Sequence, residues 1–183
     1  MKAIAAHFLA TYAQLVADKV SEQLEAVLGG GGEAPAAIIH IGHAPGLSIL
    51  ELSVALGLSH PGTVRLVDKL VDTGMAERTN GRDGRTRLLA LTPKGKAMRD
   101  KLLAARLAAA ESVMVGLSDT EWETIRDQLA RIIKTVPESA AARPRICRLC
   151  DRGMCRFYFN LKSTTGQEAA LQAEGGCDLY RLA

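Results

Sequence analysis

The sequence predicts a mainly α-helical protein with one small β element and a cysteine-rich C-terminal extension. Alanine accounts for 28 of the 183 residues and aromatic residues for only 4%, which suits closely packed helices better than a β-sandwich. Apolar residues also recur every three or four positions over long stretches, which is the period of an amphipathic helix. All four cysteines lie in the last 37 residues, so the end of the chain differs in chemistry from the rest.

The composition also excludes some classes of protein. The chain is 48% apolar and 23% charged, as expected of a globular protein with one good core. No apolar run approaches the roughly 18 residues that a membrane-spanning helix needs, and polar residues interrupt any signal-peptide core near the N-terminus. We therefore expect a cytoplasmic protein with no membrane partner.

The first helix is expected over residues 2–28, where apolar positions repeat at helical spacing. Four consecutive glycines at 29–32 should end it, because their backbone entropy disfavours a helix. A short helix should follow over residues 35–41. It holds one member of the histidine pair His40 and His43, which we expect to be surface or dimer-contact residues.

The next stretch predicts two short helices joined by a tight turn. Ser48 can cap the first helix, Gly57 can make the turn, and Ser59 can cap the second helix, with Pro61 in its first turn. This pattern is a helix-turn-helix, whose second helix offers side chains near its N-terminus to base edges in the major groove of DNA. The residues expected to face the groove are Ser59, His60, Gly62, Thr63 and Arg65.

A β-hairpin is predicted after the second helix. Residues 75–78 and 86–91 have strand patterns, and the segment 80–85 between them has the composition of a hairpin tip. Thr92 and Pro93 then begin another helix. Helix, helix, hairpin and helix make a winged helix-turn-helix. We expect Arg82 and Arg85 of the wing in the minor groove and Lys94 and Lys96 near phosphates.

Charge gives this region modest support as a DNA-binding unit. Between residues 48 and 96 there are eight lysines and arginines against five acids. Charge alone fits a solvated surface equally well, so the prediction depends on the pattern of elements.

These motifs resemble those of the MarR family of bacterial regulators. The resemblance rests on Leu66-Val67-Asp68 in the second helix, on Asp83 with Arg85 in the wing, and on Leu91-Thr92-Pro93-Lys94-Gly95 at the next helix. It covers roughly residues 4–138 and is strongest within 47–96. It implies an obligate homodimer held by the first and last helices, a pseudo-palindromic DNA operator, and in many members a small aromatic acid as effector. The glycine-rich wing tip and about 40 extra C-terminal residues depart from the family pattern.

Four consecutive parts follow from this interpretation. Residues 1–33 are expected to be an N-terminal dimerisation helix with a glycine linker, and residues 34–96 the winged helix-turn-helix. Residues 97–138 should form C-terminal dimerisation helices, and residues 139–183 a four-cysteine tail.

The tail has the spacing C-x2-C-x4-C-x21-C, formed by Cys147, Cys150, Cys155 and Cys177. Disulfides are disfavoured in the cytosol, so clustered cysteines indicate metal or redox chemistry. Uneven spacing with one remote cysteine favours an iron–sulfur cluster, [2Fe–2S] or [4Fe–4S], over structural Zn²⁺, which usually uses two C-x2-C pairs. Unligated thiols or a reversible disulfide remain the simpler alternative.

The sequence therefore predicts a homodimeric transcriptional regulator, with repression the expected mode, whose operator affinity depends on an iron–sulfur cluster. The main alternative is a similar regulator with a structural zinc site and a small aromatic effector. A thiol-based redox protein and a winged helix that binds protein are further alternatives. No Ser/His/Asp or paired-carboxylate pattern is present, so we do not expect an enzyme.

Overall fold

The computed structural model describes residues 1–80, 87–135, 145, 147–151 and 154. Its elements, in chain order, are α1 (Lys2–Leu28), α2 (Ala34–His43), β1 (Leu47–Ser48), α3 (Ile49–Leu56), α4 (His60–Asp72), β2 (Ala76–Asn80), β3 (Arg87–Leu91), α5 (Pro93–Ser112), α6 (Asp119–Thr135) and the 3-10 helix η1 (Cys147–Leu149). The predicted fold class, a mainly helical winged helix-turn-helix, is confirmed.

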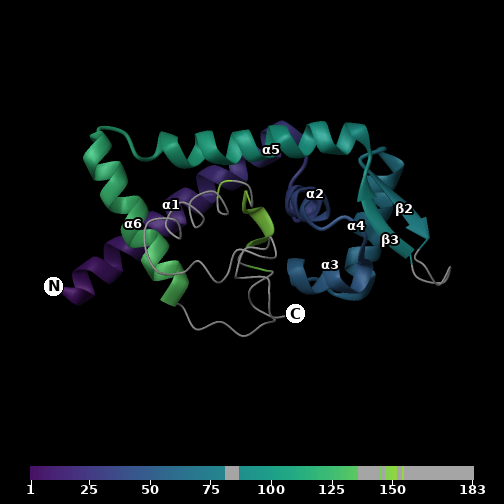
Figure 1. Cartoon of the computed structure of the whole chain (residues 1–183), viewed down its shortest axis with the longest axis horizontal. Coiled ribbons are helices and arrows are strands. Elements are labelled where there is room, and N and C mark those ends of the chain that lie inside the picture. Colours follow the sequence, from purple (N-terminus) through teal and green to yellow (C-terminus); the bar gives the residue numbers. More distant parts are fainter. Residues whose placement is uncertain (81–86, 136–144, 146, 152–153, 155–183) are drawn as a thin grey trace, which may run out of the picture.

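Two long helices, α1 and α5, connect a small lobe at one end of the molecule with helix α6 at the other (Figure 1). Helices α1 and α5 lie side by side, and α2 packs against α5 and β3. Helices α3 and α4 and the sheet lie at one end of α5, while α6 turns back from the other end. Gly29 ends α1 in the left-handed conformation, as the glycine run predicts.

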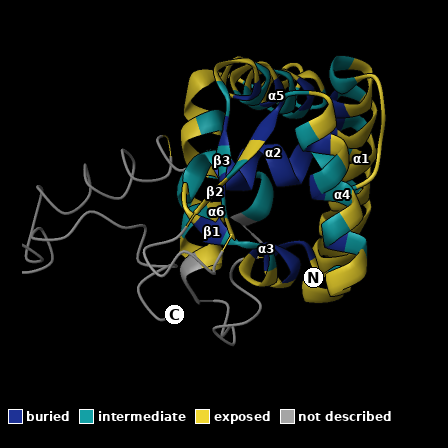
Figure 2. Cartoon of the chain, turned by 90° about the vertical axis from the view of Figure 1, so that its right-hand side faces the viewer, coloured by how far each residue is buried: buried dark blue, intermediate teal, exposed yellow. Residues whose placement is uncertain are grey.

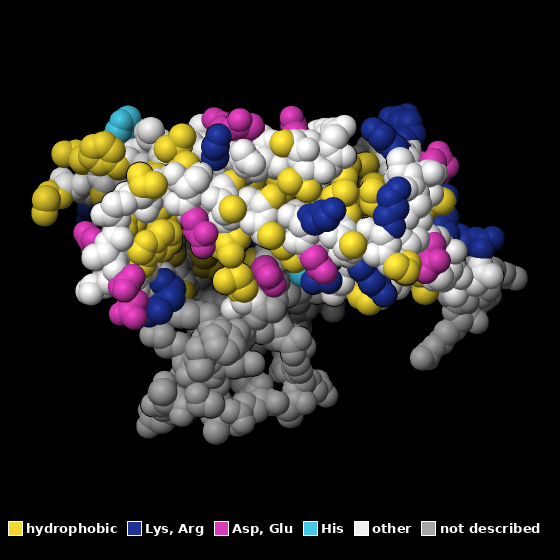
Figure 3. Space-filling view, turned by 90° about the horizontal axis from the view of Figure 1, so that it is seen from above, with side chains coloured by type: hydrophobic (Ala, Val, Ile, Leu, Met, Phe, Trp, Pro, Cys, Tyr) yellow, Lys and Arg dark blue, Asp and Glu magenta, His cyan; other side chains and the backbone are white. Residues whose placement is uncertain are grey.

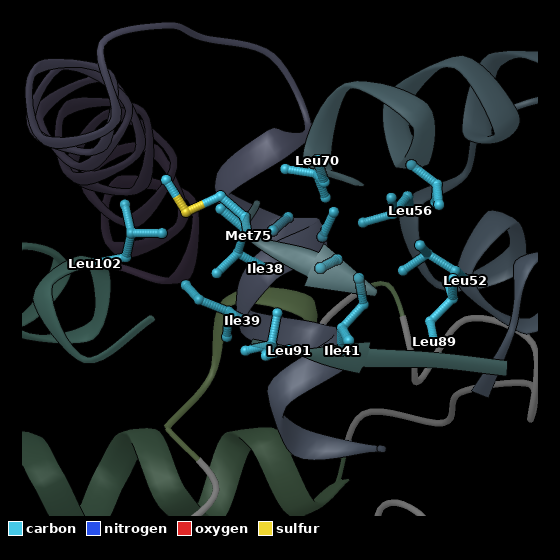
Figure 4. Close-up of a cluster of buried hydrophobic side chains, with 14 of the residues drawn as sticks. Ile38, Ile39, Ile41, Leu52, Leu56, Leu70, Met75, Leu89, Leu91 and Leu102 are labelled. Carbon is cyan, nitrogen blue, oxygen red and sulfur yellow. The ribbon is translucent and has the colours of Figure 1, made fainter. Parts of the chain in front are cut away.

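Helix α2 is the centre of the core. Figure 2 shows it as a buried element surrounded by the others, and Ile38, Ile39 and Ile41 have no exposed surface. Leu52 of α3 and Leu89 of β3 lie within the same cluster of buried side chains (Figure 4). Each such side chain stabilises the fold by about 1.5–3 kcal/mol relative to exposure.

The expectation that His40 lies at the surface is wrong. Its side chain is only 5% exposed, because nearly all of α2 is enclosed by its neighbours. His43, at the end of the same helix, is half-buried.

The sheet has the strand order β1-β3-β2 and is antiparallel throughout. Leu47 of β1 pairs with Leu89, and Ala76 of β2 pairs with Leu91. The two hairpin strands are confirmed, whereas the two-residue strand β1 was not predicted. The predicted wing tip, including Arg82 and Arg85, lies outside the described residues.

The first turn of α5 lies against the chain that enters β2. Thr92 caps α5 by accepting a hydrogen bond from the amide of Gly95 (3.1 Å), and its own hydroxyl donates to the carbonyl of Gly74 (2.6 Å). A Cβ atom at Gly95 would lie 1.9 Å from the carbonyl oxygen of Met75. Only glycine therefore allows this close approach between α5 and the base of the wing.

Large apolar side chains remain exposed on α1 and α6. The N-terminal half of α1 and the second half of α6 carry those that are more than 40% exposed: Ile4, Phe8, Leu9, Leu15, Leu129, Ile132 and Ile133. Figure 3 shows hydrophobic side chains gathered at the end of the molecule where α1 begins. Among the described residues, no helix is both long enough and apolar enough to cross a membrane.

Candidate nucleic-acid interface and cysteine segment

The helix-turn-helix is held in shape by local caps that the sequence predicts. Ser48 and Glu51 form a reciprocal capping box at the start of α3, in which the Ser48 amide donates to Glu51 Oε2 (2.7 Å) and the Ser48 hydroxyl accepts from the Glu51 amide (3.3 Å). Hydrogen bonds from the Ser48 amide and hydroxyl lower the pKa of Glu51 below its ordinary value of 4.5. Gly57 then makes the turn at φ +67°, a conformation that favours glycine.

Helix α4 is the recognition helix of this motif. Ser59 caps it, and its hydroxyl accepts from the amide of Gly62 (3.3 Å). His60 and Arg65 are exposed, as predicted, and Gly62 is half-buried. The N-terminal part of α4 thus presents an imidazole and a guanidinium, side chains that can hydrogen-bond to base edges.

Thr63 does not face outward, so the prediction that it lies on the exposed face is wrong. Its side chain has no exposed surface, and its hydroxyl donates to the carbonyl of Ser59 (3.1 Å). The buried stripe of α4 runs through Thr63, Val67 and Leu70, whereas Val64 is only half-buried. A valine is a more usual core residue than a threonine, so composition alone favours Val64 over Thr63 for the buried stripe.

One further cation on α4 was not predicted as a DNA-facing residue. Lys69 is exposed four residues after Arg65, and residues at this spacing lie on the same face of a helix. The i, i+4 spacing of the two cations was the available signal.

Two arginines stabilise the base of the wing. Arg78 of β2 forms an ion pair with Asp68 of α4 (2.5 Å), which ties the hairpin to the recognition helix. Arg87 of β3 donates to the side chain of Asn80 on the neighbouring strand. Arg87 is exposed and next to the wing tip, so it adds positive charge there.

Lys94 and Lys96, the predicted phosphate contacts, are both exposed at the start of α5. Lys94 Nζ donates to the carbonyl of Thr73, the residue that ends α4 (2.8 Å). This interaction satisfies a carbonyl at the C-terminus of α4 and fixes the lysine beside the recognition helix. Figure 3 shows lysine and arginine side chains gathered at this end of the molecule.

Part of the cysteine tail packs on the core. Residues 147–149 form η1, which lies against α2, and Leu149 contacts the buried cluster. The carbonyl of Cys150 accepts a hydrogen bond from His43 Nε2 (2.6 Å), and Arg148 pairs with Glu33 (3.5 Å). Both ends of α2 therefore hold the beginning of the tail.

The predicted metal site begins at η1. Cys147 begins η1 and Cys150 follows its last residue, Leu149. Cys150 is half-buried, whereas Cys155 and Cys177 lie outside the described residues. Within the described residues, no three potential ligands come together. The four-cysteine centre therefore stays a prediction.

A cavity of about 320 Å³ lies along α5. Arg99 and Arg106 provide positive charge, and Leu103 and Leu107 provide apolar surface. Arg99 Nε is buried without a hydrogen-bond partner among the described residues. The cavity thus combines two arginines and two carboxylates, Asp100 and Asp151, with apolar surface.

The described residues include a capped recognition helix, an antiparallel hairpin beside it and a helix that continues from the hairpin. These three elements define a winged helix-turn-helix protein of the DNA-binding type. Comparison with protein families matches residues 32–86 to the MarR family. The family match and the fold together support a MarR-family winged-helix transcriptional regulator. A comparison with curated protein sequences gives no match.

Solved structures show the same fold. A MarR-family transcriptional regulator from Rhodococcus sp. RHA1 is 26% identical, over 72% of this chain and 94% of its own, with a TM-score of 0.56. The Mycobacterium tuberculosis MarR family protein Rv2887 in complex with DNA is 20% identical, over 69% of this chain and 95% of its own, with a TM-score of 0.58. Its complex with p-aminosalicylic acid is 22% identical, over 69% and 96% of the two chains, with a TM-score of 0.57.

Proposed function

We propose that the protein is a cytoplasmic, homodimeric transcriptional repressor that binds a pseudo-palindromic operator in double-stranded DNA. The observation that carries this proposal is the exposure of His60 and Arg65 at the N-terminal end of a capped helix α4. Lys69 extends the same face, and Arg87 and Lys96 add exposed positive charge on neighbouring elements. A face of this kind can read base edges and neutralise phosphates.

The homodimer is supported by the exposed apolar faces of α1 and α6. Phe8 of α1 is 66% exposed and Ile133 of α6 is 47% exposed. Neither apolar side chain is covered by the rest of the described subunit. A second copy of the chain would cover both faces at once, because a two-fold interface uses the same patches on each subunit. Two recognition helices would then meet half-sites about one helical turn apart.

The four-cysteine tail is proposed to bind one metal centre per subunit, with an iron–sulfur cluster favoured and Zn²⁺ as the alternative. Cys147, Cys150, Cys155 and Cys177 would be the ligands, and a cluster would supply a centre that responds to oxidation or iron supply. Cys150 is half-buried beside the C-terminal end of α2, where its carbonyl accepts a hydrogen bond from His43. This position supports a metal centre that contacts the folded domain rather than one in a detached tail. A zinc site would stabilise the same fold without responding to oxidants.

A small aromatic acid is proposed as a second effector. Rv2887 has been crystallised with p-aminosalicylic acid, and the cavity along α5 offers Arg99 and Arg106 for a carboxylate and Leu103 for a ring. The specific observation that favours this site is Arg99 Nε, which is buried and has no hydrogen-bond partner in the described part of the chain.

Gel retardation with metal analysis tests the proposal. Protein purified without oxygen should retard a fragment from upstream of its own gene at low salt, and Arg65→Ala should weaken this binding. Brown protein with iron and sulfide supports the cluster, whereas colourless protein with one zinc per chain supports the alternative. No retardation of any such fragment at low salt would contradict the regulator.

A further inference from the structure

Arg145, far along the chain from the DNA-binding lobe, lies against the turn of the helix-turn-helix. A Cβ atom added at Gly57 would be 2.8 Å from Arg145 Cζ, 2.9 Å from its Nε and 3.0 Å from its Nη2. Gly57 is exposed and forms the turn between α3 and the recognition helix α4. The guanidinium can come this close to the backbone because residue 57 has no side chain.

Contacts with α2 and the core hold the backbone of Arg145 in this place. Arg148 Nη1 donates to the Arg145 carbonyl (2.6 Å), and Arg148 Nε lies 3.5 Å from Oε2 of Glu33, the residue that precedes α2. Leu149 packs on the buried cluster. The position of Arg145 therefore depends on contacts with the folded domain.

The charge of Arg145 is not neutralised by an acidic side chain of the described residues. Arg145 is exposed, and none of the ion pairs within the described part of the chain includes it. Glu51 of α3 is engaged in the capping box at the opposite end of that helix, and Asp68 of α4 pairs with Arg78. The Arg145 guanidinium thus remains able to bind an anion.

This guanidinium also lies close to the beginning of the recognition helix. Gly57 precedes Ser59, the residue that caps α4, by two positions, and two extended residues span at most about 7 Å. Side chains at the N-terminal end of a recognition helix contact base edges in the major groove, which is about 12 Å wide and bordered by two phosphate strands. A cation beside the turn is therefore within the distance of a bordering phosphate when α4 enters the groove.

We propose that Arg145 binds a phosphate of the DNA backbone beside the half-site that α4 of the same subunit reads. A guanidinium has two parallel N–H donors that match a pair of phosphate oxygens. The inference rests on the proposed function, because it requires α4 to enter the major groove. Every DNA sequence has the same phosphates, so Arg145 adds affinity without base preference.

A purely structural role for Arg145 is the alternative. The guanidinium lies at the C-terminal end of α3, where positive charge interacts favourably with the helix dipole. In that case Arg145 stabilises the fold and neutralises no phosphate. The salt dependence of DNA binding separates the two roles, because each neutralised phosphate makes a defined contribution to it.

The test measures the affinity of the full chain for a duplex as a function of salt concentration. Each phosphate contact contributes about 0.9 to the slope of log affinity against log salt, and the proposed dimer has two copies of Arg145. Arg145→Gln should therefore reduce this slope by about 2. Its loss of affinity relative to the unsubstituted protein should shrink by about tenfold between 50 and 200 mM salt.

Two further variants are the controls for this measurement. Arg145→Lys should keep the slope, because lysine retains the positive charge. Arg131→Gln removes an exposed arginine from α6, at the opposite end of the molecule from the helix-turn-helix (Figure 1). Arg131 donates to the neutral side chain of Gln128, and its substitution should leave the slope unchanged.

The duplex is one that the unsubstituted chain selects, and an unrelated duplex of the same length measures base preference. A lower slope in Arg145→Gln with unchanged base preference supports the phosphate contact. An unchanged slope overturns the contact and leaves the regulator intact, and a lowered Tm in the same variant would then establish the structural role. An altered base preference in Arg145→Gln also contradicts the proposal. An unsubstituted chain that binds no duplex at low salt contradicts the proposed function and this contact together.

Discussion

Gly95→Ala tests how tightly α5 is seated against the base of the wing. The new Cβ atom would lie 1.9 Å from the Met75 carbonyl oxygen and 2.9 Å from its carbon, and both are backbone atoms that cannot rotate away. Helix α5 would have to move by roughly 1 Å to restore a normal contact. That movement would stretch the hydrogen bonds of Thr92 to the carbonyls of Gly74 (2.6 Å) and Met75 (3.2 Å).

Two effects of opposite sign decide how far Gly95→Ala changes the free energy of unfolding. Alanine is favoured over glycine within a helix by about 1 kcal/mol. Overpacking against a rigid group costs about 1–3 kcal/mol, and weakening two part-buried hydrogen bonds costs about 1 kcal/mol each. The clash dominates, so we expect the free energy of unfolding to fall by about 2–4 kcal/mol.

Thermal unfolding followed by circular dichroism at the helical band measures this change. For a protein of this size each kcal/mol lowers Tm by about 2–4 °C, so Gly95→Ala should unfold about 5–15 °C below the unsubstituted protein. Gly30→Ala is the control, because its Cβ atom would have no neighbour within 4 Å. A Gly95→Ala protein as stable as the control would refute the close approach of α5 and the wing.

Three further predictions concern the recognition helix, the capping box and the dimer. Thr63→Val should lower the free energy of unfolding by about 1 kcal/mol through one lost hydrogen bond and leave the base preference of DNA binding unchanged. Arg65→Ala should change that base preference in competition binding. An altered base preference in Thr63→Val would show that Thr63 reads DNA. Ser48→Ala should cost about 1 kcal/mol through the lost cap. The backbone amide of residue 48, which alanine keeps, is the larger cause of the lowered Glu51 pKa, and the Ser48 hydroxyl is the smaller cause. The hydroxyl's part of the stability difference should be full above pH 4.5 and should be lost as the pH falls through the lowered pKa. A difference independent of pH in acid titrations of Tm would contradict this. Ile133→Asp should convert dimers to monomers in sedimentation velocity, and an unchanged dimer would show that this face of α6 is not the interface.

Much of the DNA-binding lobe could be predicted because its signals are local. Ser48 and Ser59 cap the two helices as expected, and Gly57 and Thr92 occupy the turn and cap positions that their types suggest. These residues act on backbone groups within four positions, so the sequence contains both partners of each interaction.

Except at Thr63, the differences arise where contacts between residues distant in the sequence decide the outcome. Thr63 is buried because its hydroxyl bonds to the carbonyl of Ser59, which allows a polar residue in the core stripe. Strand β1 is two residues long and exists only through its pairing with β3. The contacts of Cys150 with His43 and of Arg145 with Gly57 join residues about 90 or more positions apart, and no local pattern marks them.

Selection of bound duplexes from a random DNA pool tests the central claim most directly. The chain should enrich a pseudo-palindromic sequence whose half-sites lie about one helical turn apart, bound by two chains per duplex. Arg65→Ala should lose the preference at specific positions in each half-site, while Val115→Asp should enrich the same sequence as the unsubstituted protein. A pool with no enriched sequence, or an enriched single half-site bound by one chain, would contradict a dimeric winged-helix regulator.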